Sequence, residues 1–199
     1  MKIIIVGGTG TIGKAIAEEL APRHTIISVG NKSGDFQVDI GDMKSIERLY
    51  QKIGSFDALI SATGKVHFGS LTEFTEEQYH IGLNNKLMGQ VNLVLVGLKH
   101  INEGGSFTLT SGILSHDPIK FGSSASMVNG AIDSFVKSAA IEMPKSIRIN
   151  AVSPTVLTES FASYGPYFRG FESVAANRVA LAYSKSVEGA QNGMIYKAN

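Results

Sequence analysis

The sequence contains no cysteine and no tryptophan. The absence of cysteine excludes disulfides, thiol redox chemistry and cysteine-ligated zinc. The sequence also has no large excess of charge of either sign, since 18 basic and 17 acidic residues leave a formal net charge of +1. This balance, without a long run of like charges, indicates neither a nucleic-acid nor a membrane-surface partner. The five histidines are widely scattered, so no metal site is predicted.

Long apolar runs are missing as well. The longest, at residues 91–98, is far below the ~20 residues that span a bilayer. Because Met1 and Lys2 lead directly into a short apolar run, no signal peptide is expected. With 199 residues, 43% of them hydrophobic, we expect one domain over residues 1–199 and a cytoplasmic location.

Glycine, in contrast, is abundant, and three glycines follow the first apolar run. Residues 2–6 lead into GGTGTIG and then into an amphipathic stretch, which predicts strand, tight turn and helix. Gly7 permits the turn, Gly10 lets the backbone approach a pyrophosphate, and Gly13 allows the helix to pack closely. The free amides that open the helix bind phosphate. The predicted dinucleotide site therefore includes Gly7, Thr9, Gly10, Thr11, Ile12 and Gly13.

Apolar runs typical of strands alternate with segments of helical period along the chain. The predicted strands are 2–6, 25–29, 58–61, 107–110, 147–152 and 194–196. The predicted helices are 42–53, capped by Asp42, 75–100, opened by a Thr75/Gln78 capping box, 123–142, and 172–187. This alternation predicts an α/β fold with a doubly wound parallel sheet between two helical layers.

Residues 154–170 form the one long segment that no element explains. Long connections at the carboxyl ends of parallel strands commonly hold ligands, so this segment is a candidate substrate flap. A disordered surface loop is the alternative.

Several stretches together resemble the short-chain dehydrogenase/reductase family. They are GGTGTIG, Val38-Asp39-Ile40, Ser61-Ala62-Thr63-Gly64, the strand Gly105 to Ser111, and Arg148 to Pro154. The resemblance implies a single Rossmann-type sheet of seven strands in the order 3-2-1-4-5-6-7. It also implies cofactor contacts at Asp39, Ile40, Ala62, Thr63, Gly64, Pro154 and Thr155.

The end of the second predicted strand bears on the choice of cofactor. An NAD site usually places an acidic residue there to hold the ribose 2′-hydroxyl, whereas this chain has Asn31, Lys32 and Ser33. Lys32 can neutralise a 2′-phosphate, and the other two side chains can donate hydrogen bonds to it. NADP(H) is therefore favoured over NAD(H), although Asp35 lies nearby and Lys32 has an alternative interpretation as a solvated turn residue.

The catalytic residues that the resemblance implies are only partly present. Family members use a tyrosine, a lysine four residues later and a serine, and Ser111 matches the serine. Alignment of the 123–135 segment places Ser123 at the tyrosine and Met127 at the lysine. Loss of positioned acid–base groups typically costs ~10²–10⁴ in rate. The family's further asparagine falls near Asn84, Asn85 or Lys86, which suggests that Lys86 partly replaces the absent lysine.

Other residues are candidate proton donors. His116 has a side chain of suitable unperturbed pKa in the loop after Ser111, and Tyr164 and Tyr167 lie on the unassigned segment. Ser115-His116-Asp117 is not expected to form a triad, because adjacent residues seldom face one another.

Two functions follow from these observations. The first is an NADP(H)-dependent oxidoreductase of a small carbonyl or alcohol substrate with a non-standard proton donor. The second is a catalytically silent NADP(H)-binding regulator or sensor. In both cases the two long predicted helices, 75–100 and 123–142, resemble those that pack between family subunits, so a homodimer or homotetramer is expected.

Overall fold

The computed structural model describes residues 1–199 and contains one seven-stranded parallel sheet. Its strand order, β3-β2-β1-β4-β5-β6-β7, is the order that the family resemblance implies. The strands are β1 Lys2–Val6, β2 Thr25–Gly30, β3 Phe36–Gln37, β4 Phe56–Ser61, β5 Ile101–Thr110, β6 Arg148–Pro154 and β7 Ile195–Ala198. The helices are α1 Thr11–Leu20, α2 Met43–Ile53, α3 Glu76–Ile81, α4 Met88–Gly97, α5 Ser123–Glu142, α6 Phe161–Tyr164 and α7 Ala176–Glu188.

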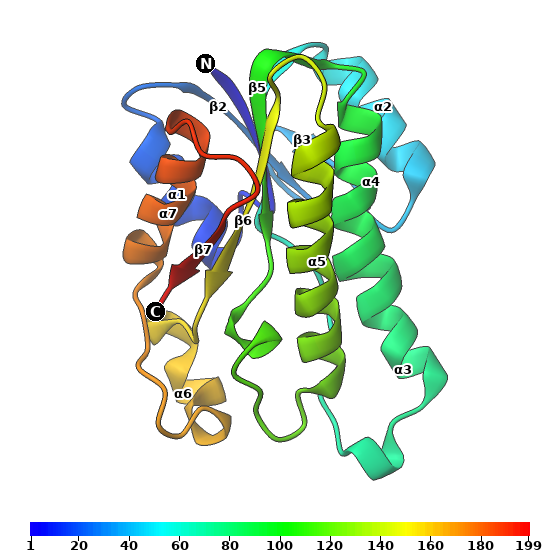
Figure 1. Ribbon diagram of the computed structural model, residues 1–199, viewed down its shortest axis with the longest axis vertical. Helices are drawn as coiled ribbons and strands as arrows, with labels where there is room; N and C mark the ends of the chain where they lie inside the picture. The colour runs from blue at the N-terminus through cyan, green and yellow to red at the C-terminus, as the bar shows by residue number, and fades with distance from the viewer.

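Helices cover both faces of the sheet, as predicted. Figure 1 shows α1 and α7 on one side of the strands and α2, α4 and α5 on the other. Because side chains alternate along a strand, β1 supplies both cores. Ile3 and Ile5 pack with α1 and α7, whereas Ile4 and Val6 pack with the opposite helices. None of the helices is long and apolar enough to cross a lipid bilayer.

Two predicted helix starts are confirmed by their capping contacts. The Asp42 carboxylate accepts a hydrogen bond from the Lys44 backbone N–H at 2.9 Å. Thr75 and Gln78 form the expected reciprocal capping box. These local contacts satisfy backbone donors that a helix leaves without an internal partner.

The long helix predicted toward residue 100 is present over residues 76–97, but it is not α-helical throughout. The segment divides into α3, a π-helical stretch Gly82–Leu87, and α4. Apolar periodicity does not reveal such a π stretch, which widens the helix locally and occurs frequently at functional sites. Here it contains Asn84, Asn85 and Lys86. The family's further asparagine was predicted to fall at one of these three positions.

Two further segments differ from the sequence-based expectation. β3 has only two residues, too few to register as an apolar run. Residues 154–170 are not a featureless loop, because they contain the 3₁₀ turns Thr158–Ser160 and Gly165–Tyr167 around α6. The last helix begins at Ala176 rather than at residue 172, and the Glu159 carboxylate accepts a hydrogen bond from the Ala176 N–H at 2.9 Å. A side chain near the start of this flap therefore caps the next helix.

Candidate active site

The glycine-rich loop joins β1 to α1 in a conformation that depends on its glycines. Gly7 has φ +87°, a left-handed value that favours glycine. A Cβ atom at Gly13 would collide with the Gly7 carbonyl oxygen, so the helix packs against the loop without room for a side chain. No side chain caps α1 at Gly10, and no acidic residue lies in its first turn. The first amides of α1 are thus left to bind an anion.

A cavity of about 410 Å³ opens beside this loop, at the carboxyl ends of β1, β2 and β4. Eight of its lining residues belong to the predicted cofactor site: Gly7, Thr9, Gly10, Asn31, Asp39, Ile40, Ala62 and Thr63. Five others were not predicted: Val6, Gly30, Val38, Lys65 and Asn85. The Asn85 side-chain oxygen accepts a hydrogen bond from the Lys65 N–H at 2.8 Å and joins the π-helical stretch to this wall.

The remaining predicted cofactor residues lie outside this lining. Lys32 and Ser33 are exposed in the turn after β2. The carboxylate of nearby Asp35 accepts a hydrogen bond from the Ser28 N–H at 2.8 Å, so it is turned toward β2. Thr155, which follows Pro154 at the end of β6, is buried and bound through its N–H to the Ala198 carbonyl.

Lys86 lies where β4 and β5 end. Its ammonium donates a hydrogen bond to the Ser111 carbonyl oxygen at 2.9 Å. Its side chain passes so close to Gly64 that a Cβ there would lie 2.5 Å from Lys86 Cγ. Lys86 is half-buried, and burial lowers the pKa of its ammonium to about 8 although the negative charge of Asp133 opposes that shift. Among the three residues that the sequence left open, Lys86 is the one that contacts Ser111.

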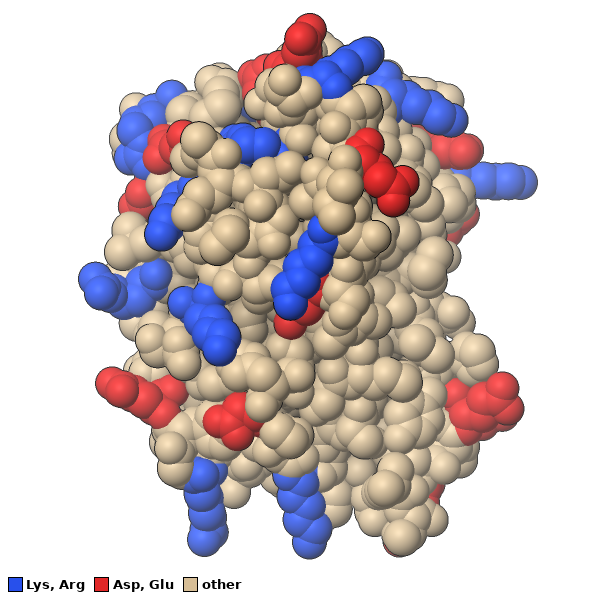
Figure 2. All heavy atoms as spheres, viewed as in Figure 1, with Lys and Arg blue, Asp and Glu red and all other residues tan.

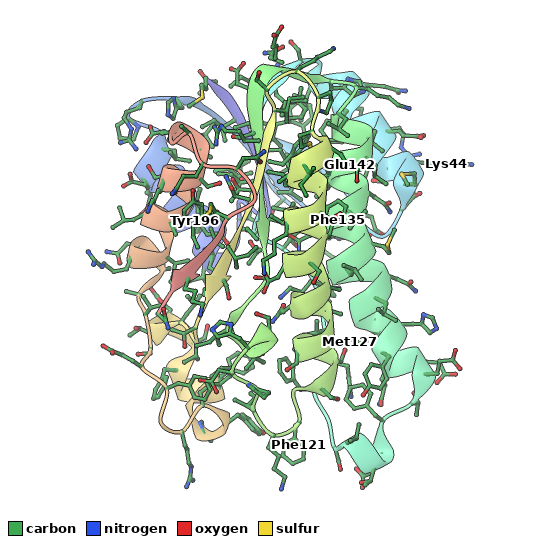
Figure 3. The ribbon with its side chains drawn as sticks, viewed as in Figure 1. Lys44, Phe121, Met127, Phe135, Glu142 and Tyr196 are labelled. Atoms are coloured by element: carbon green, nitrogen blue, oxygen red, sulfur yellow. The ribbon has the colours of Figure 1, made fainter.

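The structure corrects the position assigned to the missing lysine. Met127 is 43% exposed, and Figure 3 shows it on the outside of α5. Asn129 is the buried residue that faces the end of β5, since a Cβ at Gly112 would lie 2.8 Å from its amide nitrogen. Ala125, four residues before Asn129, is buried on the same face of α5. The alignment chose Ser123 and Met127 because sequence alone does not fix the rotation of α5.

Three polar atoms near Lys86 are buried and have no hydrogen-bond partner within the protein. They are Ser111 Oγ, Asn129 Oδ1 and Asp133 Oδ1. Buried polar atoms are normally paired, so an unpaired group in a native structure calls for a partner such as a ligand. Ser111 directly follows β5, and Asn129 and Asp133 belong to α5; we call this part of the candidate site the reaction end.

The other candidate donors are not brought to Ser111. His116 is exposed and has a single hydrogen-bond neighbour, Ser115 Oγ at 3.2 Å. Tyr164 and Tyr167 line a separate cavity described below. A phenol that the sequence analysis overlooked, that of Tyr79, lies 3.0 Å from Ser123 Oγ. Tyr79 and Ser123 are 44 residues apart in the sequence, so no local motif predicts this contact.

Comparison with known proteins places this arrangement in a family. Residues 11–196 match the family model described as Enoyl-(Acyl carrier protein) reductase. The chain belongs to the short-chain dehydrogenase/reductase family. A short chain dehydrogenase/reductase of Aspergillus aculeatus, AacuN, is 31% identical and matches 91% of this chain and 80% of its own. Versicolorin reductase 1 of Dothistroma septosporum is 30% identical, over 81% and 72% of the two chains.

Solved structures of similar proteins have the same fold. The protein lin1944 from Listeria innocua is 50% identical, with a TM-score of 0.99 over the whole of both chains. A small-chain dehydrogenase in complex with NADPH is 26% identical, with a TM-score of 0.90 over 100% of this chain and 96% of that one. Within this short-chain dehydrogenase/reductase framework, helix α5 has no tyrosine, and its one lysine, Lys137, is exposed beyond the site.

Proposed function

We propose that the protein is an NADP(H)-dependent oxidoreductase that interconverts a small carbonyl compound and its alcohol, with Lys86 in place of the family's tyrosine–lysine pair. The observation that carries the proposal is the half-buried Lys86, whose ammonium is bound to the Ser111 carbonyl directly after β5. Support for the cofactor comes from the 26% identical dehydrogenase that contains NADPH.

The residues around the glycine loop suit a dinucleotide. The amides that open α1 offer donors to the pyrophosphate, and the Asp39 and Ile40 wall suits the adenine. Asn31 lines the cavity beside the exposed Lys32, and neither has a negative charge that would repel a 2′-phosphate. When bound, the nicotinamide supplies or accepts the hydride. The unpartnered Ser111 and Asn129 atoms lie where such a ligand would need hydrogen bonds.

The proton of the reduction comes from Lys86 in this proposal. An ammonium whose pKa is about 8 is mostly protonated at neutral pH and is a far better acid than an ordinary lysine. Lys86 Nζ would donate this proton to the substrate's carbonyl oxygen and become a neutral amine. The buried Ser111 hydroxyl, which has no other partner, orients that oxygen by a hydrogen bond.

A second function has its own observation. Ala125 and Asn129, which turn inward from α5 beside the end of β5, lack a proton that is readily transferred near neutral pH. This favours a silent NADP(H)-binding sensor, in which Lys86 serves only to hold the nucleotide.

Cofactor binding and turnover separate the two functions. NADPH and NADH are titrated by calorimetry, and aldehydes, ketones and quinones are then screened for loss of the reduced-nicotinamide absorbance. We expect NADPH to bind more tightly and at least one carbonyl to be reduced. Binding without turnover over the whole panel favours the sensor, and no binding of either nucleotide rejects both functions.

Variants then identify the donor. Lys86→Met should lower turnover ~10²–10⁴-fold, whereas Lys137→Met, which removes an exposed lysine of α5, should not change it. If Tyr79→Phe lowers turnover and Lys86→Met does not, the phenol is the donor. With Lys86 as the acid, the reduction rate should fall as the pH rises through about 8, the pKa of its buried ammonium.

We also propose that two copies associate through α4 and α5, which lie side by side in Figure 1. A groove of about 280 Å³ between them is lined by apolar side chains that include Leu95, Leu98 and Phe135, and Leu95 is 50% exposed. Figure 2 shows few charged side chains over α4. Light scattering should give a dimer or tetramer for the native chain and a smaller species for Leu95→Glu.

A further inference from the structure

A second cavity, of about 400 Å³, lies at the lower end of the molecule in Figure 1, between the segments around α3 and α6. Three loops build it: residues 68–73 after β4, residues 119–121 after β5, and residues 164–168 after β6. All three follow carboxyl ends of parallel strands, where folds of this class bind ligands. The cavity is distinct from the one at the glycine loop, with which it shares no lining residue.

Aromatic rings dominate its walls. Five of the nine lining residues are aromatic: Phe68, Phe121, Tyr164, Tyr167 and Phe168. Tyr164 and Tyr167 are 49% and 53% exposed, although large apolar side chains gain free energy from burial. Neither phenol has a hydrogen bond to another residue of the protein. These rings are available to stack against a ligand.

The backbone at Phe121 supports a binding role. Phe121 has φ +68°, which is an outlier for a bulky residue. Figure 3 shows it in the loop that leads into α5. Its ring lies edge-on to Tyr167, with centroids 6.3 Å apart, so the strained residue closes one side of the cavity.

The cavity is connected to the candidate active site through its inner wall. Phe168 is buried in a cluster with Ile113, Leu114 and Ala125. Ile113 follows Ser111 by two residues, and Ala125 lies one helical turn before Asn129 on α5. A ligand that rests on this wall is therefore held near the reaction end.

Charge limits the kind of ligand. Glu73 is the one ionisable acid in the lining, and no lysine or arginine lines the cavity. An anionic ligand would meet a carboxylate without a balancing cation. A cationic ligand is opposed at the rim, where the Lys120 ammonium lies 4.9 Å from the centre of the Phe121 ring. A neutral ligand avoids both penalties.

We infer that this cavity binds a neutral, planar aromatic carbonyl compound of about two or three fused rings, a size consistent with a small-ligand pocket. The ring system stacks on Tyr164, Tyr167 and Phe68, and Glu73 rejects carboxylated or phosphorylated analogues. The carbonyl in this assignment rests on the proposed function, whereas the aromatic and uncharged character rests on the cavity alone.

The test compares three probes by calorimetry and saturation-transfer NMR, with and without NADPH: 1-tetralone, a tetralone carboxylate, and cyclohexanone. We expect 1-tetralone to bind at least tenfold more tightly than either of the others. Tyr167→Ala should weaken tetralone binding at least tenfold. The matched control, Phe161→Ala, removes an exposed ring from the same flap but outside the lining, and should leave binding unchanged.

Charge reversal provides a gain of binding that poor folding cannot imitate. Glu73 is exposed at the rim, and Glu73→Lys should raise the affinity for the carboxylate about tenfold while 1-tetralone binds as before. The inference is overturned if the native protein binds the carboxylate as tightly as 1-tetralone, or if Tyr167→Ala has no effect. Tetralone binding without NADPH binding would refute the proposed function alone, and the converse would refute this inference alone.

Discussion

The two ends of the candidate site are built in different ways. At the glycine loop, the groups that suit the nucleotide are backbone amides and the space left by absent side chains. At the reaction end, the groups are side chains from three elements: Lys86, Ser111 and Asn129. A backbone site tolerates few substitutions, because it depends on glycine geometry. A side-chain site can exchange its functional groups between neighbouring helices while the fold is retained.

Substitution at Gly13 should have the largest effect, because it breaks the backbone end. Any Cβ there collides with the Gly7 carbonyl, and Gly7 is itself held by a 2.7 Å hydrogen bond from its N–H to Val29. We expect Gly13→Ala to abolish measurable NADPH binding and to destabilise the fold by roughly 1–3 kcal/mol. Gly130→Ala in α5 is the control, since open space surrounds that position and alanine favours a helix. Thermal denaturation and calorimetry measure both effects.

An exchange of Lys86 and Asn129 tests whether the reaction end can be rearranged. Lys86→Asn removes the charge, and Asn129→Lys places a second ammonium near the first, so each alone should weaken NADPH binding about tenfold or more. The double variant restores a single cation beside Ser111 and should recover most of the affinity. If it binds no better than the weaker single variant, the two positions do not serve the same group.

Removal of the Lys86 charge should raise the stability of the protein although it lowers turnover. Its folded pKa of about 8 lies below the ordinary 10.5, so the unfolded chain binds more protons between those values. The buried ammonium therefore costs stability below about pH 8, and this cost disappears as the pH rises toward 10.5. Lys86→Met should raise the melting temperature of the nucleotide-free protein at pH 7 by a few degrees, about 2–4 °C per kcal/mol. A lower melting temperature would show that the Ser111 hydrogen bond outweighs the desolvation.

The preference between the two nucleotides should respond to one nearly isosteric change. Asn31→Asp introduces a carboxylate into the cavity wall, which repels a 2′-phosphate. We expect NADPH affinity to fall about tenfold while NADH affinity stays the same or rises. Asn177→Asp, at an exposed position of α7, is the control and should change neither. Equal loss for both nucleotides would contradict a 2′-phosphate contact at Asn31.

The smallest predicted effect lies away from both ends, where α1 meets α7. The Arg23 guanidinium, with His24 and Ser184, lowers the pKa of Glu188 to about 2. Because this pKa is depressed on folding, the contact stabilises the protein above about pH 4.5 and is lost as the pH falls toward 2. Glu188→Gln should lower stability at pH 7 by less than about 1 kcal/mol, since the pair is near the surface. Urea denaturation at pH 7 and pH 3 should show the difference shrinking.

Elements with a local signal were predictable from the sequence. The Asp42 cap and the Thr75/Gln78 box use contacts within three residues, and both are present as predicted. Strand β1 and the glycine loop that follows it were predictable for the same reason, because a short apolar run and the spacing of the glycines are local features of the sequence. Elements without such a signal were missed or wrong: the two-residue β3 and the π-helical stretch before α4.

The sequence by itself determined the class of fold and the glycine-rich loop. Both depend on patterns among residues that are close together in the chain: the alternation of apolar periods and the spacing of the glycines. Only the tertiary structure decided which side chains meet: Lys86 rather than Asn84 or Asn85 at Ser111, Asn129 rather than Met127 facing β5, and five aromatic rings around one cavity. The rotation of a helix about its axis and the approach of distant loops depend on packing across the whole sheet. No short stretch of sequence encodes them.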